Sequence, residues 1–314
     1  MIWLAWRQQR LQLIVSLSLV AALAAVVVGV HLDAVAYLHS HGITRCLSHA
    51  TQACEPGMSM FRDRYDMVES TITSVLVGVP VVLGIFAGAP LFAREFEQRT
   101  HLFALTQSMS RTRWWITKLV VAGAPVVLGT ALLGVLNAWA ATPLDYFGGS
   151  RLGTPNFESQ GLVLAAYALL AFTISAVAGQ LSRNTVAAMA VGLALYVGIV
   201  VGVSQGARPH YQAPVALRAG VSDVTPSIPR GGTWVSMDYV NAAGARLDYT
   251  AMHCEGLDGT FEECLKQNDI TSQVVEYQPA TRFWPFQLAE SGIVAVLSAA
   301  LLGLGGVLLL RRLR

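Results

Sequence analysis

Six apolar runs divide this chain of 314 residues, and none of them contains an aspartate, glutamate, lysine or arginine. The runs cover residues 11–30, 71–92, 119–141, 161–181, 185–203 and 291–310. A helix of about twenty residues, rising ~1.5 Å per residue, crosses the ~30 Å hydrocarbon core of a bilayer. The pattern predicts an all-α polytopic membrane protein with six transmembrane helices.

The basic residues predict how these helices are oriented. If the N-terminus is cytoplasmic, the inner segments are 1–10, 93–118, 182–184 and 311–314. They hold 11 of the 21 basic residues but only 2 of the 19 acidic ones. Because short cytoplasmic loops are enriched in lysine and arginine, we expect both termini in the cytoplasm and a large extracellular loop before the last helix.

Composition supports a membrane-embedded chain, since 54% of the residues are hydrophobic and only 13% are charged. We expect five spans in 1–203, an extracellular loop or small cap in 204–290, and the sixth span with a basic cytoplasmic tail in 291–314. Arg7 and Arg10 precede the first run as they would in a signal peptide. The run is longer than a usual signal core, which favours a retained first helix.

The outer segments differ in character. Segment 31–70 is a polar, histidine-rich loop by pattern, and 142–160 is rich in turn-forming residues. Within 204–290, alternation at 233–239 and 246–250 favours short strands, and 259–266 is compatible with a few helical turns.

The first outer segment also contains potential metal ligands. Histidine and cysteine bind zinc and copper, but their spacing here matches no familiar motif, so solvated loop histidines are favoured and we predict no metal site. The residues concerned are His31, His39, His41, His49, Cys46 and Cys54.

Two inner segments have helical periodicity. Phe96, Leu102 and Phe103 recur against charged neighbours in 94–115, which predicts a short amphipathic cytoplasmic helix between the second and third spans. The alternative is an interfacial loop whose tryptophans and arginines anchor the third span. At the N-terminus, Trp3 and Trp6 indicate either a helix in the headgroup plane or a straight continuation of the first span.

Catalytic motifs are missing from the sequence. The two lysines, Lys118 and Lys266, do not follow glycine-rich loops, so the chain has no P-loop, and it has no H-E-x-x-H, G-x-S-x-G or Cys-x-x-Cys motif. No aspartate, glutamate, lysine, arginine or histidine lies inside an apolar run, where a proton relay would normally require one. We therefore expect that the chain is not an enzyme.

Three stretches resemble bacterial ABC exporter permeases of the six-helix, type V class. Residues 90–100 read P-L-F-A-R-E-F-E-Q-R-T and continue as L-T-Q-S-M-S-R-T-R-W at 105–114; a second stretch lies at 277–290 and a third at 3–8. The resemblance implies a multi-pass protein of the bacterial inner (cytoplasmic) membrane. It also implies two ATP-binding subunits that hold ATP and Mg²⁺, and a second permease copy or homologue.

The resemblance further implies roles for particular residues. A coupling helix in 94–115 would dock on the ATP-binding subunit through Arg94, Glu95, Glu97, Arg99, Thr100, Arg111 and Trp114. Spans one, two and five would face a path between two bundles, which makes Gly78, Gly84, Tyr196 and Val197 candidates for its lining.

The cargo implied by the resemblance is a hydrophobic or amphiphilic compound, such as an antibiotic, a drug or a lipid, that moves outward. The alternative function comes from a different class: a membrane-anchored binding or sensory protein whose extracellular loops recognise a ligand. A neighbouring gene for an ATPase with a P-loop would favour the first.

All four cysteines fall on the predicted extracellular side, in two close pairs, and this pattern predicts two disulfides. We expect Cys46 joined to Cys54 and Cys254 joined to Cys264, each stabilising its loop by about 2–3 kcal/mol on the chain-entropy model. Mass spectrometry of non-reduced peptides tests the pairing. Four free thiols, or cross-pairing between the loops, would contradict it.

Overall fold

The computed structural model describes residues 2–44, 55–98, 110–143, 150–220, 228–229, 231–248, 252 and 261–312. Within these residues, six helices are long and apolar enough to cross a membrane. They are α1 (Ile2–Ser40), α2 (Glu55–Glu97), α4 (Arg111–Ala140), α6 (Val163–Ser182), α7 (Thr185–Val201) and α9 (Phe283–Arg312). Each predicted apolar run lies on one of them, apart from at most two residues at an end. The prediction of a helical membrane protein with six spans is confirmed.

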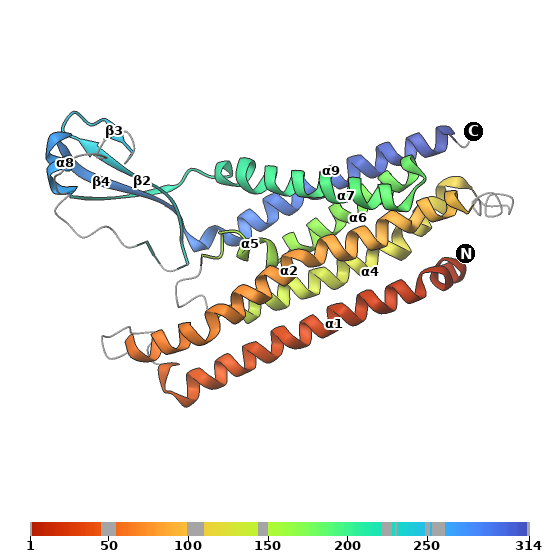
Figure 1. Cartoon of the computed structure of the whole chain (residues 1–314), viewed down its shortest axis with the longest axis horizontal. Coiled ribbons are helices and arrows are strands. Elements are labelled where there is room, and N and C mark those ends of the chain that lie inside the picture. The colour runs from red at the N-terminus through yellow and green to blue at the C-terminus, as the bar shows by residue number, and fades with distance from the viewer. Residues whose placement is uncertain are drawn as a thin grey trace.

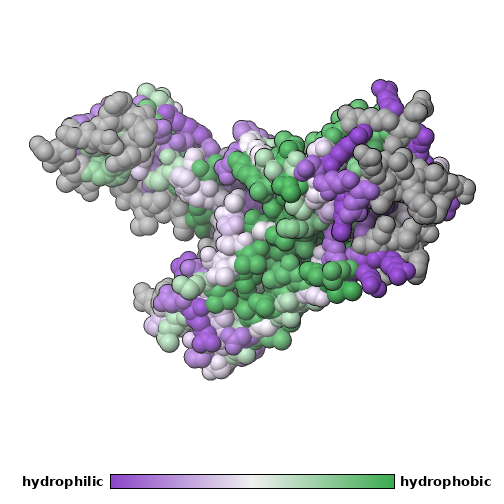
Figure 2. All heavy atoms as spheres, turned by 45° about the vertical axis from the view of Figure 1, so that its right-hand side comes forward, coloured by the Kyte–Doolittle hydropathy of each residue, from purple (hydrophilic) through white to green (hydrophobic). Residues whose placement is uncertain are grey.

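The six helices lie side by side in one elongated bundle (Figure 1). Both termini lie at one end, which we call the termini end, and a small β-sheet lies beyond the other, the sheet end. On the face shown in Figure 2, a hydrophobic belt crosses the bundle between more hydrophilic ends. The belt matches the apolar surface that lipid tails require, while the cytoplasmic location of the termini stays a prediction.

Two helices continue well beyond the bilayer. The 39 residues of α1 and the 43 of α2 correspond to about 58 Å and 65 Å of helix. Segment 31–70, predicted as a polar loop, is therefore mostly a helical hairpin, since Leu38 of α1 packs on Phe61 and Tyr65 of α2. The hydroxyl of Tyr65 donates to Asp33 at 2.6 Å. Continuous helix from Ile2 favours a straight continuation of span one over a separate interfacial helix.

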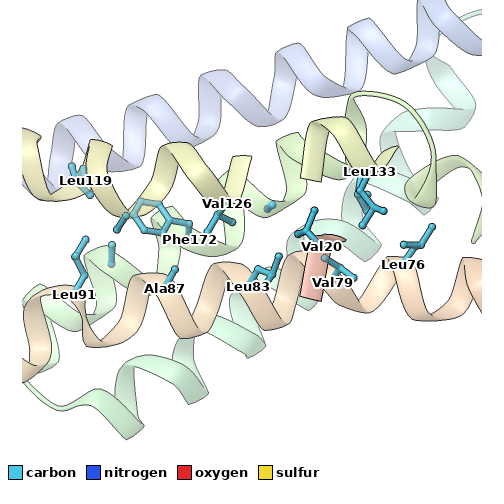
Figure 3. Close-up of a cluster of buried hydrophobic side chains, with 14 of the residues drawn as sticks. Val20, Leu76, Val79, Leu83, Ala87, Leu91, Leu119, Val126, Leu133 and Phe172 are labelled. Atoms are coloured by element: carbon cyan, nitrogen blue, oxygen red, sulfur yellow. The ribbon is translucent and has the colours of Figure 1, made fainter. Parts of the chain in front are cut away.

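Helix α6 is the centre of the bundle. Of its most apolar stretch, 83% is buried, against 17% for those of α1 and α7, and it packs against α2, α4, α7 and α9. Phe172 of α6 fills the space between α2 and α4 (Figure 3). The outer helices thus present apolar faces to lipid while α6 is enclosed by protein.

Glycines allow α2 to approach α6 closely. A Cβ added at Gly88 would lie 2.3 Å from the carbonyl oxygen of Phe172, and one at Gly84 would lie 2.6 Å from the Cβ of Ala171. Small residues at such contacts bring helix backbones together in membranes, where van der Waals packing largely replaces the hydrophobic effect.

The segment between α7 and α9 folds into a small α+β unit. Strands β1 (Val215–Gly220), β2 (Thr233–Asn241), β3 (Arg246–Leu247) and β4 (Ile270–Gln278) form an antiparallel sheet in the order β1-β4-β2-β3. Helix α8 (Phe261–Gln267) packs on it. The π-helix η4 (Gly202–Ala207) and the 3₁₀ turns η5 (Arg208–His210) and η6 (Ala280–Arg282) connect this unit to α7 and α9.

Sequence patterns identified only half of this sheet. The strands expected at 233–239 and 246–250 correspond to β2 and β3, and the expected helix corresponds to α8. The central strand β4 and the edge strand β1 were not predicted. Cys264 is buried in α8 beside Tyr239 and Met252, whereas Cys46, Cys54 and Cys254 lie outside the described residues, so the disulfide pairing stays a prediction.

Replacing Gly88 with alanine is expected to destabilise the bundle by about 1–3 kcal/mol, because the new methyl group cannot fit against the α6 backbone. The matched control is Gly78→Ala on the same helix, where an added Cβ meets no atom within 4 Å. Thermal unfolding in detergent, followed by tryptophan fluorescence, measures the difference. Equal midpoints for the two variants would contradict the close contact.

Candidate functional site

At the termini end, an ion pair joins the end of α2 to the start of α4. The Lys118 ammonium contacts the Glu95 carboxylate, and both side chains are largely buried. The same ammonium lies 5.2 Å from the centre of the Trp114 ring. Lys118 begins the apolar part of α4, so its charge needs a partner at this depth. Glu95 supplies that partner.

A second carboxylate joins α2 to α7. Glu97 accepts hydrogen bonds from the backbone N–H of Thr185 at 2.8 Å and from its hydroxyl at 3.2 Å. Thr185 is the first residue of α7, where helical N–H groups lack partners and negative charge is stabilising. Asn184, the N-cap, accepts from the N–H of Ala187. The turn between α6 and α7 is thereby fixed to the end of α2.

The described residues of 94–115 lie mainly on the two long helices. Arg94, Glu95 and Glu97 belong to the last turns of α2, and Arg111 and Trp114 to the first turn of α4, which Ser110 caps. The two spans therefore extend into both ends of the predicted segment, while residues 99–109 lie outside the described residues, so the coupling helix stays a prediction. Arg99 and Thr100 lie outside the described residues.

Contacts within the chain separate the predicted coupling residues into two groups. Arg94 and Arg111 are exposed. Glu95 and Glu97 bind Lys118 and Thr185 within this chain, and Trp114, only 4% exposed, packs edge-on against Phe92. The role of Glu95 and Trp114 in docking on a partner stays a prediction, although both side chains make contacts within this chain. Each is held inside the bundle by a contact that the sequence pattern did not reveal.

The predicted path-lining residues also fall into two groups, one inside the bundle and one away from its packed interior. Gly84 packs against α6, and Tyr196 is buried with its ring edge-on to Tyr167, so both lie inside this bundle. Val197 is 47% exposed and Gly78 meets no neighbouring atoms at its Cβ position. The path-lining role of all four residues stays a prediction, and Val197 and Gly78 are the two of them that lie away from the packed interior.

At the sheet end, a charged network that the sequence did not reveal is buried among α5 (Asn156–Ser159), α6, η5 and α9. Arg208 donates from Nε and Nη2 to the two oxygens of Glu290, at 2.9 and 2.7 Å. The same Nη2 lies 2.8 Å from an oxygen of Glu158. Tyr167 of α6 donates to Glu290 at 2.5 Å, and Thr154 donates to Glu158 at 2.8 Å.

The stoichiometry of this network is uneven, because two carboxylates share one guanidinium. Glu290 has no exposed surface, and Arg208 and Glu158 are almost completely buried. The Arg208 guanidinium also lies 4.1 Å from the centre of the Phe157 ring. Buried ions persist only when geometry and hydrogen bonds offset their desolvation, and the bidentate contact supplies both.

Amide hydrogen bonds extend the network along α9. Gln287, one turn before Glu290, donates to the carbonyl oxygen of Phe157 at 2.9 Å and accepts from the N–H of Val163 at 2.9 Å. Gly161 has a φ of +65°, and a Cβ there would lie 2.6 Å from the Gln287 side chain. The start of α9 is thus locked to the chain that enters α6.

Comparison with known families identifies the chain. The model of the family described as ABC-2 membrane transporter related matches residues 17–208, more than half of the chain. The chain belongs to this ABC-2 family. No curated protein and no solved structure matches it.

The ABC-2 match covers most of α1 and all of α2, α4, α6 and α7, and it ends at Arg208. Membership assigns the chain to the membrane subunits of ABC transporters, that is, to a transport role. Glu158 and Arg208 therefore lie within the family region, whereas Glu290, their common partner, comes from α9 beyond it. The network joins the two parts of this ABC-2 protein.

Removing Arg208 is expected to destabilise the protein by about 3–5 kcal/mol, since two buried carboxylates lose their counter-charge. Adding Glu290→Gln to Arg208→Ala should restore part of the loss by removing one negative charge. The control is Arg246→Ala in the sheet, where the arginine also bonds a glutamate, Glu276, but is 46% exposed.

We expect this exposed pair to contribute less than about 1 kcal/mol. Thermal unfolding midpoints of the variants test the ranking. Equal losses in Arg208→Ala and Arg246→Ala would show that the buried network is not the stronger constraint.

Proposed function

We propose that this chain is the permease subunit of a bacterial ABC exporter, which moves a hydrophobic or amphiphilic compound outward across the inner membrane. A separate subunit would bind ATP and Mg²⁺ and hydrolyse the ATP. The working assembly would hold two such subunits and two permease chains. Membership of the ABC-2 family is the observation that carries this proposal.

Surface charge at the termini end supports a partner there. Arginines from several helices are exposed at this end, and a partner with acidic groups would match them. The exposed residues are Arg7, Arg10, Arg94, Arg111, Arg113, Arg183 and Arg311. The chain has no P-loop, so ATP hydrolysis would come from a separate subunit. The exposed arginines make this end the place where that subunit would bind.

The contacts within the chain indicate how a displacement of the ATP-binding subunit would be transmitted to the helices. Arg111 and Arg113 would touch the partner, together with Arg99 and Thr100 from the connecting segment. Glu95 and Glu97 would pass the displacement on, because they tie α2 to α4 and α7. Docking and transmission are thereby assigned to different side chains of the same segment.

The least covered helices suggest where a second permease would lie. Only 17% of the apolar stretches of α1 and α7 is buried, and their outward residues include Val186 at 75% exposure and Val197. A second bundle against these faces would create a path that Gly78 and Val197 border. With the path between two bundles, the large side chains packed inside each bundle would not have to separate to let a transported molecule pass.

Charge reversal tests the partner contact. The double variant Arg111→Glu, Arg113→Glu should lower transport-coupled ATPase activity of the reconstituted complex at least tenfold, since each side chain would repel an acidic partner surface. The control, Arg218→Glu, also reverses an exposed charge, but in β1 at the sheet end. Both variants should unfold at the wild-type temperature, because neither arginine of the pair is buried.

Purification with the products of neighbouring genes provides the second readout. Co-purification of an ATPase and a second permease chain supports the exporter. A chain that runs alone, with no ATPase under mild detergent, overturns it and leaves the sensory alternative, in which the sheet at the sheet end recognises a ligand.

A further inference from the structure

A polar cavity lies at the termini end between α1, α2 and α4. Its volume is about 270 Å³, smaller than the roughly 300–1,000 Å³ of pockets that hold drug-sized ligands. Pro90 and Leu91 form its apolar wall. The polar side chains that line it are Gln9, Gln12, Arg94, Glu95, Gln98 and Lys118.

A proline in α2 positions one side of this cavity. Pro90 lies inside the helix and has no N–H, so it leaves the carbonyl oxygen of Phe86 without its usual helical partner. The side-chain amide of Gln12 donates to that oxygen at 2.8 Å. This hydrogen bond ties α1 to α2 and places the preceding turn of α1, with Gln9, at the cavity.

The cavity contains an unused acceptor and an excess positive charge. The side-chain oxygen of Gln9 is buried without a hydrogen-bond partner among the described residues. Lys118 is neutralised by Glu95, whereas Arg94 has no acidic partner in the part of the chain that the structure describes. A ligand that suits this set carries an anionic group for Arg94 and a donor for Gln9.

The depth of the cavity favours a lipid as the source of that ligand. The apolar run of α2 ends at Phe92, two residues before Arg94, and the run of α4 begins directly after Lys118. Gln9 and Gln12 flank the start of the run on α1. All three helices therefore cross from apolar to polar residues at the cavity, the level at which phospholipid headgroups lie.

We propose that this cavity binds the phosphate headgroup of a membrane phospholipid in the same leaflet. The phosphate would lie against the Arg94 guanidinium and the Gln98 amide, and a headgroup hydroxyl or ammonium would donate to Gln9. The acyl chains would follow the exposed apolar side of α1, where Leu11 and Ile14 are 73% and 55% exposed. The site does not depend on an ATP-binding partner.

Native mass spectrometry of the intact chain in detergent tests the site with dioleoylphosphatidylglycerol as probe. Arg94→Gln should weaken binding of the first lipid about tenfold, since a charge-assisted contact of about 1.4 kcal/mol is lost. Gln9→Ala should weaken it about threefold. The matched control is Arg10→Gln, which removes one exposed charge from the same level of α1 but does not line the cavity, and binding should stay within twofold.

Two further probes distinguish the sources of the phosphate. Dioleoylglycerol, which has the same chains but no phosphate, should not compete, and inorganic phosphate at the same concentration should not displace the lipid. Equal lipid binding by wild type and Arg94→Gln, or equal binding of dioleoylglycerol, would overturn the site. Binding of inorganic phosphate that requires Arg94, without retained lipid, would overturn the lipid assignment. Because the chain is measured alone, these outcomes are independent of the exporter proposal.

Discussion

The close approach of α2 to α6 is the constraint from which the rest of the bundle follows. With only hydrogen atoms at Gly84 and Gly88, the two backbones touch, and Phe172 then fills the space toward α4. In a bilayer, such packing is what holds helices together. Once α2 is fixed against α6, its end is fixed too, which brings Glu95 to Lys118 and Glu97 to the start of α7.

Buried charges set the alignment of the helices at each end of the bundle. Lys118 and Glu95 align α4 with α2, while Arg208 joins Glu290 and Glu158 at the other end, aligning α7 with α9 and with the chain that enters α6. Each network loses its electrostatic compensation if one helix slides by a turn. Ion pairs of this kind cost desolvation energy, and their value lies in selecting one arrangement.

The spans could be predicted from the sequence because an apolar run is recognised from its own residues, without information about other segments. The charged network could not be found in this way. Glu290 directly precedes the sixth run and Arg208 lies five residues beyond the fifth, so both fell outside the runs. The spacing of Gln287 and Glu290 by three residues nevertheless puts both on one face of a helix. Their partner Glu158 is distant in sequence. Likewise, nothing local distinguishes buried Tyr196 from its exposed neighbour Val197, because the difference depends on where α6 lies.

The way the interior is filled bears on where a transported molecule would pass. Large side chains such as Tyr167, Phe172 and Leu133 are almost fully buried within the bundle, and a path through it would have to separate α6 from helices that its backbone touches. The peripheral helices present no such obstacle, since α1 and α7 are mostly uncovered. A movement that begins at the end of α2 would shift α2, α6 and their locked partners together. Such a rigid body changes a surface between two bundles more readily than it opens a channel inside one, which is the physical reason to place the proposed path at an interface.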